Sequence, residues 1–66
     1  MKNKVRIERA VLEISQEELA TRIGVTRQTI HAIETKKYAP SVVLAIKIAT
    51  VFGRKVEEIF ELEPED

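Results

Sequence analysis

The chain has 66 residues, of which 44% are hydrophobic and 33% are charged, and it has a formal net charge of zero and no cysteine. A chain of this length folds as one small domain that buries only about 60% of its unfolded surface, and without cysteine it has neither a disulfide framework nor a thiolate metal site. Its longest apolar run, residues 42–46, is far too short to cross a bilayer and no signal sequence is recognisable, so we expect a soluble, cytoplasmic protein without a membrane partner.

The first predicted helix begins after Asn3 and runs to about Glu13. Val5, Arg9 and Leu12 recur at helical spacing, and we expect the face that they share to point inward. The same helix carries a second apolar line, which consists of Ile7, Val11 and Ile14. This is more apolar surface than one small core requires.

Two short helices joined by a turn follow, over about residues 16–23 and 27–35. Ser15 precedes the first of them and, with the glutamate that follows it in an S-x-x-E pattern, predicts a capping box. Gly24 ends this helix because glycine adopts the positive φ angle that a tight turn needs. Thr26 begins the next helix by accepting a hydrogen bond from one of its free amide groups. The pattern predicts a helix-turn-helix.

The remainder of the chain predicts a loop and two further helices. Residues 36–40 form the loop, because proline disfavours helical angles in the residue before it. Ser41 caps a fourth helix that continues to Phe52 and that Gly53 ends. Residues 56–60 form a short fifth helix with two glutamates in its first turn, where the helix dipole favours negative charge. The sequence therefore predicts an all-α bundle of five helices without strand-like alternation of useful length.

The third helix has a polar face opposite its apolar face. At about 100° per residue, Ile30 and Ile33 point inward and Gln28 points outward. The rest of this outward face and its edges consist of Arg27, Thr29, His31, Ala32 and Thr35. Such a face suits a DNA major groove, where Gln can donate and accept at adenine and Arg can pair with guanine or a phosphate. The alternative is a solvated helix face that makes no contact with DNA bases.

The segment over residues 15–34 resembles the helix-turn-helix of the lambda-repressor-like (Cro/XRE-type) transcription regulators. The resemblance runs from about residue 3 to residue 62 and rests on the stretches Ser-Gln-Glu-Glu-Leu-Ala, Arg-Gln-Thr-Ile and Lys-Tyr-Ala-Pro-Ser. It implies a five-helix lambda-repressor-like bundle, with a DNA-binding domain over residues 1–62 and a short acidic tail over residues 63–66. It also implies a sequence-specific regulator, expected to be a repressor, that binds an inverted-repeat operator as a homodimer with its third helix in the major groove.

The resemblance also implies which side chains contact DNA. Gln16 and Thr26 match positions at which helix N-termini meet backbone phosphates in this family. The full set of expected DNA-binding residues is Gln16, Thr26, Arg27, Gln28, Thr29, His31, Lys36, Lys37 and Tyr38. For the two lysines the alternative is loop solubility, and for Tyr38 it is packing against the end of the third helix.

Two further positions match the family, and two depart from it. Arg9 and Glu34 match an ion pair that ties the first helix to the end of the recognition helix, a structural role. Glu13 and Lys36 stand where glycine is usual. Either each of them adopts a left-handed angle at some cost, or the helices end differently.

The apolar surplus on the first helix recurs on the fourth, which is apolar nearly all round. This surface and the family resemblance together imply a homodimer. The residues expected near the contact are Val51, Phe52, Val56, Ile59 and Phe60. Ordinary core packing explains any one of them equally well.

The net charge of zero conceals an asymmetry along the chain. Residues 1–56 carry all 11 Lys and Arg against five Glu, whereas residues 57–66 carry six acidic residues and no base. The basic part can attract phosphates if the acidic end points away, because charges are screened beyond about 8 Å at physiological salt. We expect residues 61–66 to be ordinary solvated surface.

Catalysis finds little support in the sequence. His31 is the only histidine, it has no acidic partner at an obvious spacing, and no cluster of metal ligands is present, so we expect no enzyme, no cofactor and no metal. The alternative to a DNA-binding regulator is a protein-binding module of the same fold, such as an antitoxin or a coactivator, but these usually carry extra segments. The predicted bundle uses nearly the whole chain, so we expect no such extra segment and no small-molecule effector domain. We therefore expect double-stranded DNA as a partner, together with the second copy in the homodimer.

Overall fold

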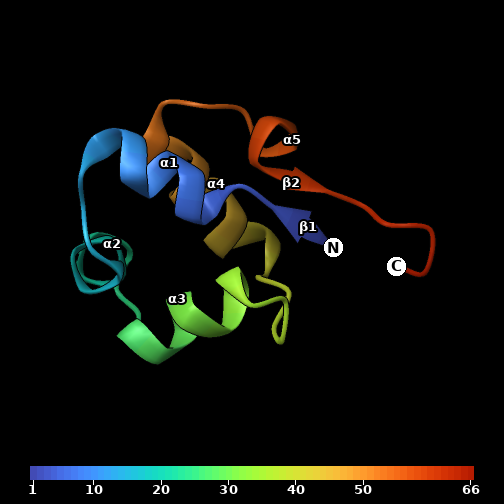
Figure 1. The fold of residues 1–66 in the computed structure, drawn as a ribbon, viewed down its shortest axis with the longest axis horizontal. Coiled ribbons are helices and arrows are strands. Elements are labelled where there is room, and N and C mark those ends of the chain that lie inside the picture. Colours follow the sequence, from blue (N-terminus) through green and yellow to red (C-terminus); the bar gives the residue numbers. More distant parts are fainter.

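The computed structural model describes all 66 residues as five helices and one short antiparallel ribbon (Figure 1). The helices are α1 (Val5–Leu12), α2 (Gln16–Ile23), α3 (Arg27–Glu34), α4 (Val42–Phe52) and α5 (Val56–Ile59). The prediction of a five-helix lambda-repressor-like bundle is confirmed. No helix is long and apolar enough to span a membrane.

The ribbon was not predicted. Strands β1 (Lys2–Asn3) and β2 (Phe60–Glu61) pair so that Lys2 faces Glu61 and Asn3 faces Phe60. The fifth helix consequently ends at Ile59, and the prediction that it includes Phe60 is wrong. Phe60 is extended, with φ −113° and ψ 134°, because this backbone lets it pair with the start of the chain. The two strands bring the chain ends side by side (Figure 1).

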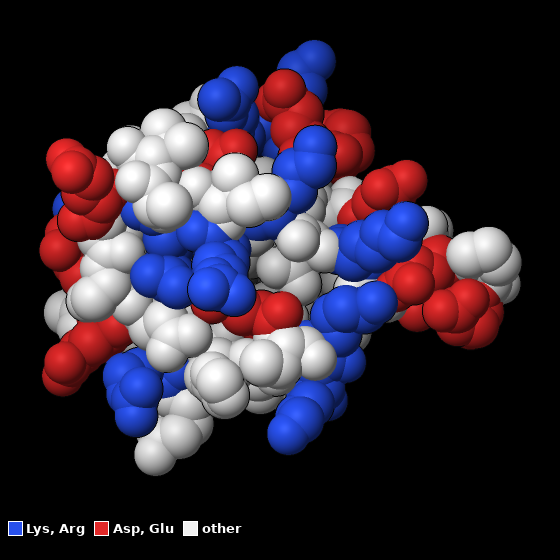
Figure 2. Space-filling model, viewed as in Figure 1, with Lys and Arg blue, Asp and Glu red and all other residues white.

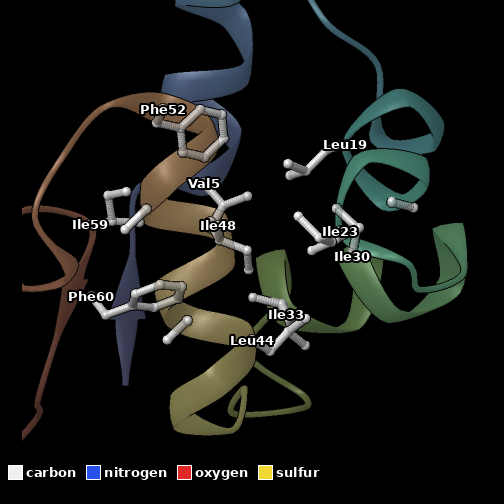
Figure 3. Packing of buried hydrophobic residues seen from close by; sticks show 13 residues of the cluster. Val5, Leu19, Ile23, Ile30, Ile33, Leu44, Ile48, Phe52, Ile59 and Phe60 are labelled. Carbon is white, nitrogen blue, oxygen red and sulfur yellow. The ribbon is translucent and has the colours of Figure 1, made fainter.

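The core is wholly hydrophobic and is arranged around α4. Figure 3 shows side chains of α2 and α3 approaching α4 from one side and those of Ile59 and Phe60 approaching from the other. Its members are Val5, Leu19, Ala20, Ile23, Ile30, Ile33, Leu44, Ala45, Ile48, Ala49, Phe52, Ile59 and Phe60. The prediction that Leu12 points inward is wrong. Leu12 is the last residue of α1, and its side chain is 42% exposed.

Local hydrogen bonds fix where the helices begin. The Ser15 Oγ accepts a hydrogen bond from the Glu18 N–H at 3.0 Å, and the Thr26 Oγ1 accepts one from the Thr29 N–H at 3.3 Å. The Ser41 Oγ does the same for α4. These three predicted caps are confirmed, but the capping box at Ser15 is only half formed, because the Glu18 carboxylate pairs with Arg22 on the next turn.

The structure shows how the chain turns at Glu13 and Lys36, the two positions where the family usually has glycine. Glu13 and Lys36 both take left-handed angles, with φ 57° and 65°, as Gly24 and Gly53 do with φ 75° and 64°. For a residue with a Cβ this conformation costs roughly 1–2 kcal/mol. The first alternative is therefore correct: the turns keep the geometry that glycine would favour.

We expected residues 61–66 to be ordinary solvated surface, but Glu63 and Asp66 form ion pairs within the chain. The Glu63 Oε1 lies 3.1 Å from the amino group of Met1 and 3.0 Å from the Nζ of Lys36, and the Glu63 side chain is only 14% exposed. Asp66 also pairs with the Met1 amino group. The antiparallel ribbon causes this fold-back, because it leads the last residues past the start of the chain.

Candidate nucleic-acid interface

Helix α3 presents its polar face to solvent. Ile30 and Ile33 are 0% and 1% exposed and anchor the opposite face in the core. Arg27, Gln28 and His31 are exposed, as is Thr35, which follows the helix. Thr29 and Ala32 are half-buried at the edges of this face. The helix is therefore oriented as predicted, and its outward side chains can donate and accept hydrogen bonds.

Arg9 and Glu34 join α1 to the end of α3. The Arg9 Nε donates to the Glu34 Oε2 at 2.6 Å, and the Arg9 Nη2 donates to the Glu34 Oε1 at 3.1 Å. The Arg9 Nη1 donates to the carbonyl oxygen of Ile14 at 3.0 Å, which ties the same guanidinium to the turn before α2. This bidentate pair fixes α3 relative to both preceding helices.

The pair is mostly shielded from water, since the side chains of Arg9 and Glu34 are only 16% and 6% exposed. Burial alone would raise the pKa of the Glu34 carboxyl. Hydrogen bonds from Arg9 and Gln16, with the nearby positive charges of Arg9 and Arg6, outweigh it, so the net shift of this pKa is downward. Glu34 therefore remains ionised.

Gln16 has a contact that its predicted role did not include. Its Nε2 donates to the Glu34 Oε1 at 3.1 Å and so joins the Arg9–Glu34 pair. A side-chain amide has two N–H groups, so one donor remains for another acceptor such as a phosphate. Gln16 and Thr26 both stand at the beginning of helices next to the outward face of α3.

The loop after α3 carries the remaining predicted contacts. Lys36, Lys37 and Tyr38 are all exposed. The backbone N–H groups of Lys37 and Tyr38 both donate to the carbonyl oxygen of Ala32, which folds the loop against the end of α3. Lys36 pairs with Glu63, whereas Lys37 forms no ion pair.

The sequence analysis did not predict the roles of two residues in this region, Asn3 and Arg6. Asn3 donates from its Nδ2 to the carbonyl oxygen of Ile33 at 2.9 Å, and its Oδ1 accepts from the Val5 N–H, so it ties the chain start to α3. Arg6 lines a hollow of about 300 Å³ between α1 and α3. Its position one helical turn before Arg9 was the available signal for Arg6. For Asn3 no local signal existed, because its partner lies 30 residues away.

The charge is unevenly distributed over this side of the molecule. Figure 2 shows Lys and Arg side chains left of the centre of the view, between the places of α1 and α3 in Figure 1, and along the lower edge, where α3 lies. Acidic side chains gather on the left beside α2 and on the right beside the C-terminal segment. The basic side chains thus lie next to the polar face of α3.

The expected dimer residues lie mainly inside the fold. Phe52, Ile59 and Phe60 are 9%, 2% and 7% exposed, and Val51 and Val56 are half-buried against the core. The large apolar side chains that remain most exposed are elsewhere. They are Ile7 and Val11 on α1, Val42, Val43 and Ile46 on α4, and Leu62 near the C-terminus.

Comparisons with known proteins agree with this geometry. The family model described as helix-turn-helix matches residues 5–59. An uncharacterized HTH-type transcriptional regulator of Methanocaldococcus jannaschii is 53% identical over 66 residues, and the regulator YgzD of Bacillus subtilis is 52% identical over 66 residues; both alignments cover 100% of each chain. A third regulator, from Methanothermobacter thermautotrophicus, is 50% identical over 64 residues, which are 96% of this chain and 93% of that one. The chain thus belongs to the Cro/XRE-type helix-turn-helix family of DNA-binding regulators, and it is not an enzyme.

Proposed function

We propose that this protein is a homodimeric transcriptional repressor that binds an inverted-repeat operator with α3 in the major groove. The observation that carries the proposal is the α3 helix itself. Its polar face is exposed and beside basic side chains, and its opposite face is fully buried. Its last turn is tied down by Asn3 and Arg9. A helix held in this way can enter a groove without losing much freedom.

In the proposed complex the contacts fall into two classes. Arg27 and Gln28, at the start of α3, read base edges, with Thr29 and His31 beside them. Gln16, Thr26 and the loop of Lys36, Lys37 and Tyr38 contact phosphates and so position the helix without reading sequence. The first class determines which operator is bound, and the second supplies most of the salt-dependent affinity.

The proposed dimer contact covers only a small part of the apolar surface that one copy leaves in water, namely the half-buried side chains of Val51 and Val56. We place the contact near the junction of α4 and α5, where Val51 and Val56 stay partly exposed above Phe52, Ile59 and Phe60. Exposed apolar patches on small proteins commonly mark interaction sites. A two-fold dimer would present two identical α3 helices, which requires an operator with matching symmetry.

The remaining parts of the proposal follow from this arrangement. Residues 1–62 act as the DNA-binding domain, and residues 63–66 form a short acidic tail that pairs with Lys36 and the chain start. A dimer bound over a promoter excludes the transcription machinery, which is why we propose repression. We propose that the protein acts in the cytoplasm, as DNA-binding regulators of this family typically do.

Selection of bound duplexes from a random pool tests the proposal directly. The expected result is an inverted repeat whose half-site centres are one helical turn, about 34 Å, apart. Recovery of no enriched sequence would contradict the proposal. Copurification of a stoichiometric protein partner that blocks DNA binding would instead favour a protein-binding module of the same fold.

A further inference from the structure

A hollow between α1 and α3 adjoins the outward face of the recognition helix. Its volume is about 300 Å³ and it has no apolar lining residue. The side chains around it come from three helices and are Arg6, Arg9, Gln16, His31, Glu34 and Thr35. A purely polar hollow next to a DNA-reading face is suited to a polar or charged ligand.

The charges in the hollow do not cancel. Glu34 is matched by Arg9, which meets it with two hydrogen bonds at 2.6 and 3.1 Å. Arg6 forms neither an ion pair nor a hydrogen bond within the chain, and it is exposed. The hollow therefore carries one unmatched positive charge, and that charge belongs to Arg6.

Arg6 and Gln16 also offer hydrogen-bond donors that remain free beside this charge. Arg6 keeps its whole guanidinium, and Gln16 keeps one N–H after bonding Glu34. The hydroxyl of Thr35 is already bonded to the carbonyl oxygen of His31 at 2.8 Å. A negatively charged ligand that accepts hydrogen bonds matches Arg6 and the free N–H of Gln16, whereas the unmatched charge of Arg6 repels a cation.

Position selects the source of that anion. His31 lines the hollow and also belongs to the outward face of α3, so a ligand in the hollow lies beside whatever α3 reads. The groove that receives a recognition helix is bordered by backbone phosphates. An exposed guanidinium gains little from an isolated anion in water, but it gains from a phosphate that the rest of the complex already holds in place.

We propose that Arg6 binds one backbone phosphate of the DNA in this hollow, so that α1 contributes a direct contact to the interface. The inference rests on the proposed function, because it requires α3 to lie in the groove. It adds to that function a residue on a different helix, and it gives Arg9 and Arg6 separate roles. Arg9 positions α3 through Glu34, and Arg6 contacts the nucleic acid.

The first test compares Arg6→Gln with Lys55→Gln, each of which removes one exposed and unpaired positive charge. Lys55 is the residue before α5, and Figure 1 shows α5 in the upper part of the view and α3 at the lower edge. Arg6→Gln should weaken binding to operator and to unrelated duplex alike, by about fivefold per subunit. It should also lower the slope of log affinity against log salt by about 0.9 per subunit. Because Lys55 lies near the proposed dimer contact, both variants are compared at protein concentrations at which sedimentation shows each of them in the same oligomeric state as the parent. Lys55→Gln should then change neither the affinity nor the slope.

The second test locates the phosphate. Neutral methylphosphonate linkages are placed one at a time through a half-site and binding of the parent and Arg6→Gln is measured. At one linkage the neutral group should weaken the parent but not Arg6→Gln, which is the signature of a direct pair. Arg6→Lys should restore the salt slope, which also controls for a loss of folding in the Gln variant.

The outcomes separate the two proposals. If the parent binds a selected operator while Arg6→Gln matches Lys55→Gln in affinity and slope, the inference about Arg6 is wrong and the proposed function stands. If phosphate neutralisation weakens parent and variant equally at every position, the inference is also overturned. If the parent binds no DNA at all, the proposed function fails and the inference fails with it.

Discussion

At the last position of α3, the carboxylate of Glu34 accepts hydrogen bonds from side chains of two other helices. Arg9 of α1 and Gln16 of α2 both donate to it at 2.6 to 3.1 Å. A buried ion pair adds little stability compared with apolar side chains of the same size, because desolvation offsets the attraction. The hydrogen bonds instead hold the end of α3 in a fixed position relative to α1 and α2.

Removing one partner of this pair should be costly. Arg9→Met leaves Glu34 with one amide donor and no ion-pair partner, and should destabilise the fold by about 3 kcal/mol. The double variant Arg9→Met with Glu34→Leu should lose much less, because no charge is left unpaired. Denaturant unfolding measures both. A single variant as stable as the parent would mean that the pair is open in solution.

Acid should weaken the same contact. The pKa of Glu34 is lowered in the folded protein, so ionised Glu34 contributes stability at pH values above the ordinary glutamate pKa of about 4.3. That contribution should be lost as the pH falls through the lowered pKa of the folded state. Melting curves at a series of pH values should show a smaller acid-induced loss for Glu34→Gln than for the parent, and equal losses would contradict this account.

Gln28 and Lys37 should affect DNA binding in different ways. Gln28→Ala should lose about 1–3 kcal/mol of discrimination at one base pair per half-site. Lys37→Ala should weaken all sequences alike and lower the salt slope by about one unit per subunit. Lys36→Ala is the control and should lower the slope less, because Glu63 already neutralises Lys36. Unchanged specificity in a folded Gln28→Ala protein would show that the reading face is assigned wrongly.

The helices of this chain are short, and their ends determine their geometry more than their interiors do. Helix α1 has eight residues, and Glu13, which follows its last residue, has a left-handed φ of 57°. The turn is completed by backbone hydrogen bonds from Glu13 to Ala10 and from Ile14 to Arg9. This brings Ile14 back towards the core and leads the chain into α2.

Glycine at position 13 should therefore stabilise the protein. Glu13 forms no side-chain hydrogen bond or ion pair, so Glu13→Gly loses no contact and removes the strain of a Cβ at positive φ. Allowing for the extra freedom of glycine in the unfolded chain, the expected net gain is about 0.5–1 kcal/mol. Glu13→Ala keeps the Cβ and should bring no such gain. Thermal unfolding of the three proteins decides the point, and a lower melting temperature for Glu13→Gly would refute it.

On the scale of the whole molecule, symmetry should limit which DNA can be bound. Two α3 helices in one dimer reach successive major grooves only when the half-site centres are about one turn apart. Inserting about five base pairs between the half-sites places the second groove on the opposite face of the duplex. Cooperative binding should then be lost while a single half-site still binds weakly. Tight one-to-one binding of a monomer to an isolated half-site would exclude the dimer.

The sequence alone was sufficient for features whose causes lie within a few residues of each other. The caps at Ser15, Thr26 and Ser41, the positive φ of Gly24 and the outward side of α3 all depend on neighbours three or four positions away. These features located the helix-turn-helix. Helical spacing also placed Ile30 and Ile33 in the core.

Only the tertiary structure decided the features that join distant parts of the chain. Strand pairing between residues 3 and 60, the Asn3 contact with α3 and the fold-back of Glu63 onto Lys36 connect residues far apart in sequence. The sequence carries no periodic signal for them, because each depends on one contact that forms only after the core has packed. The same reason applies to Arg6, whose neighbours around the hollow come from α2 and α3 as well as from its own helix. Interactions between neighbouring residues determined helix α3, and contacts between distant residues determined what surrounds it.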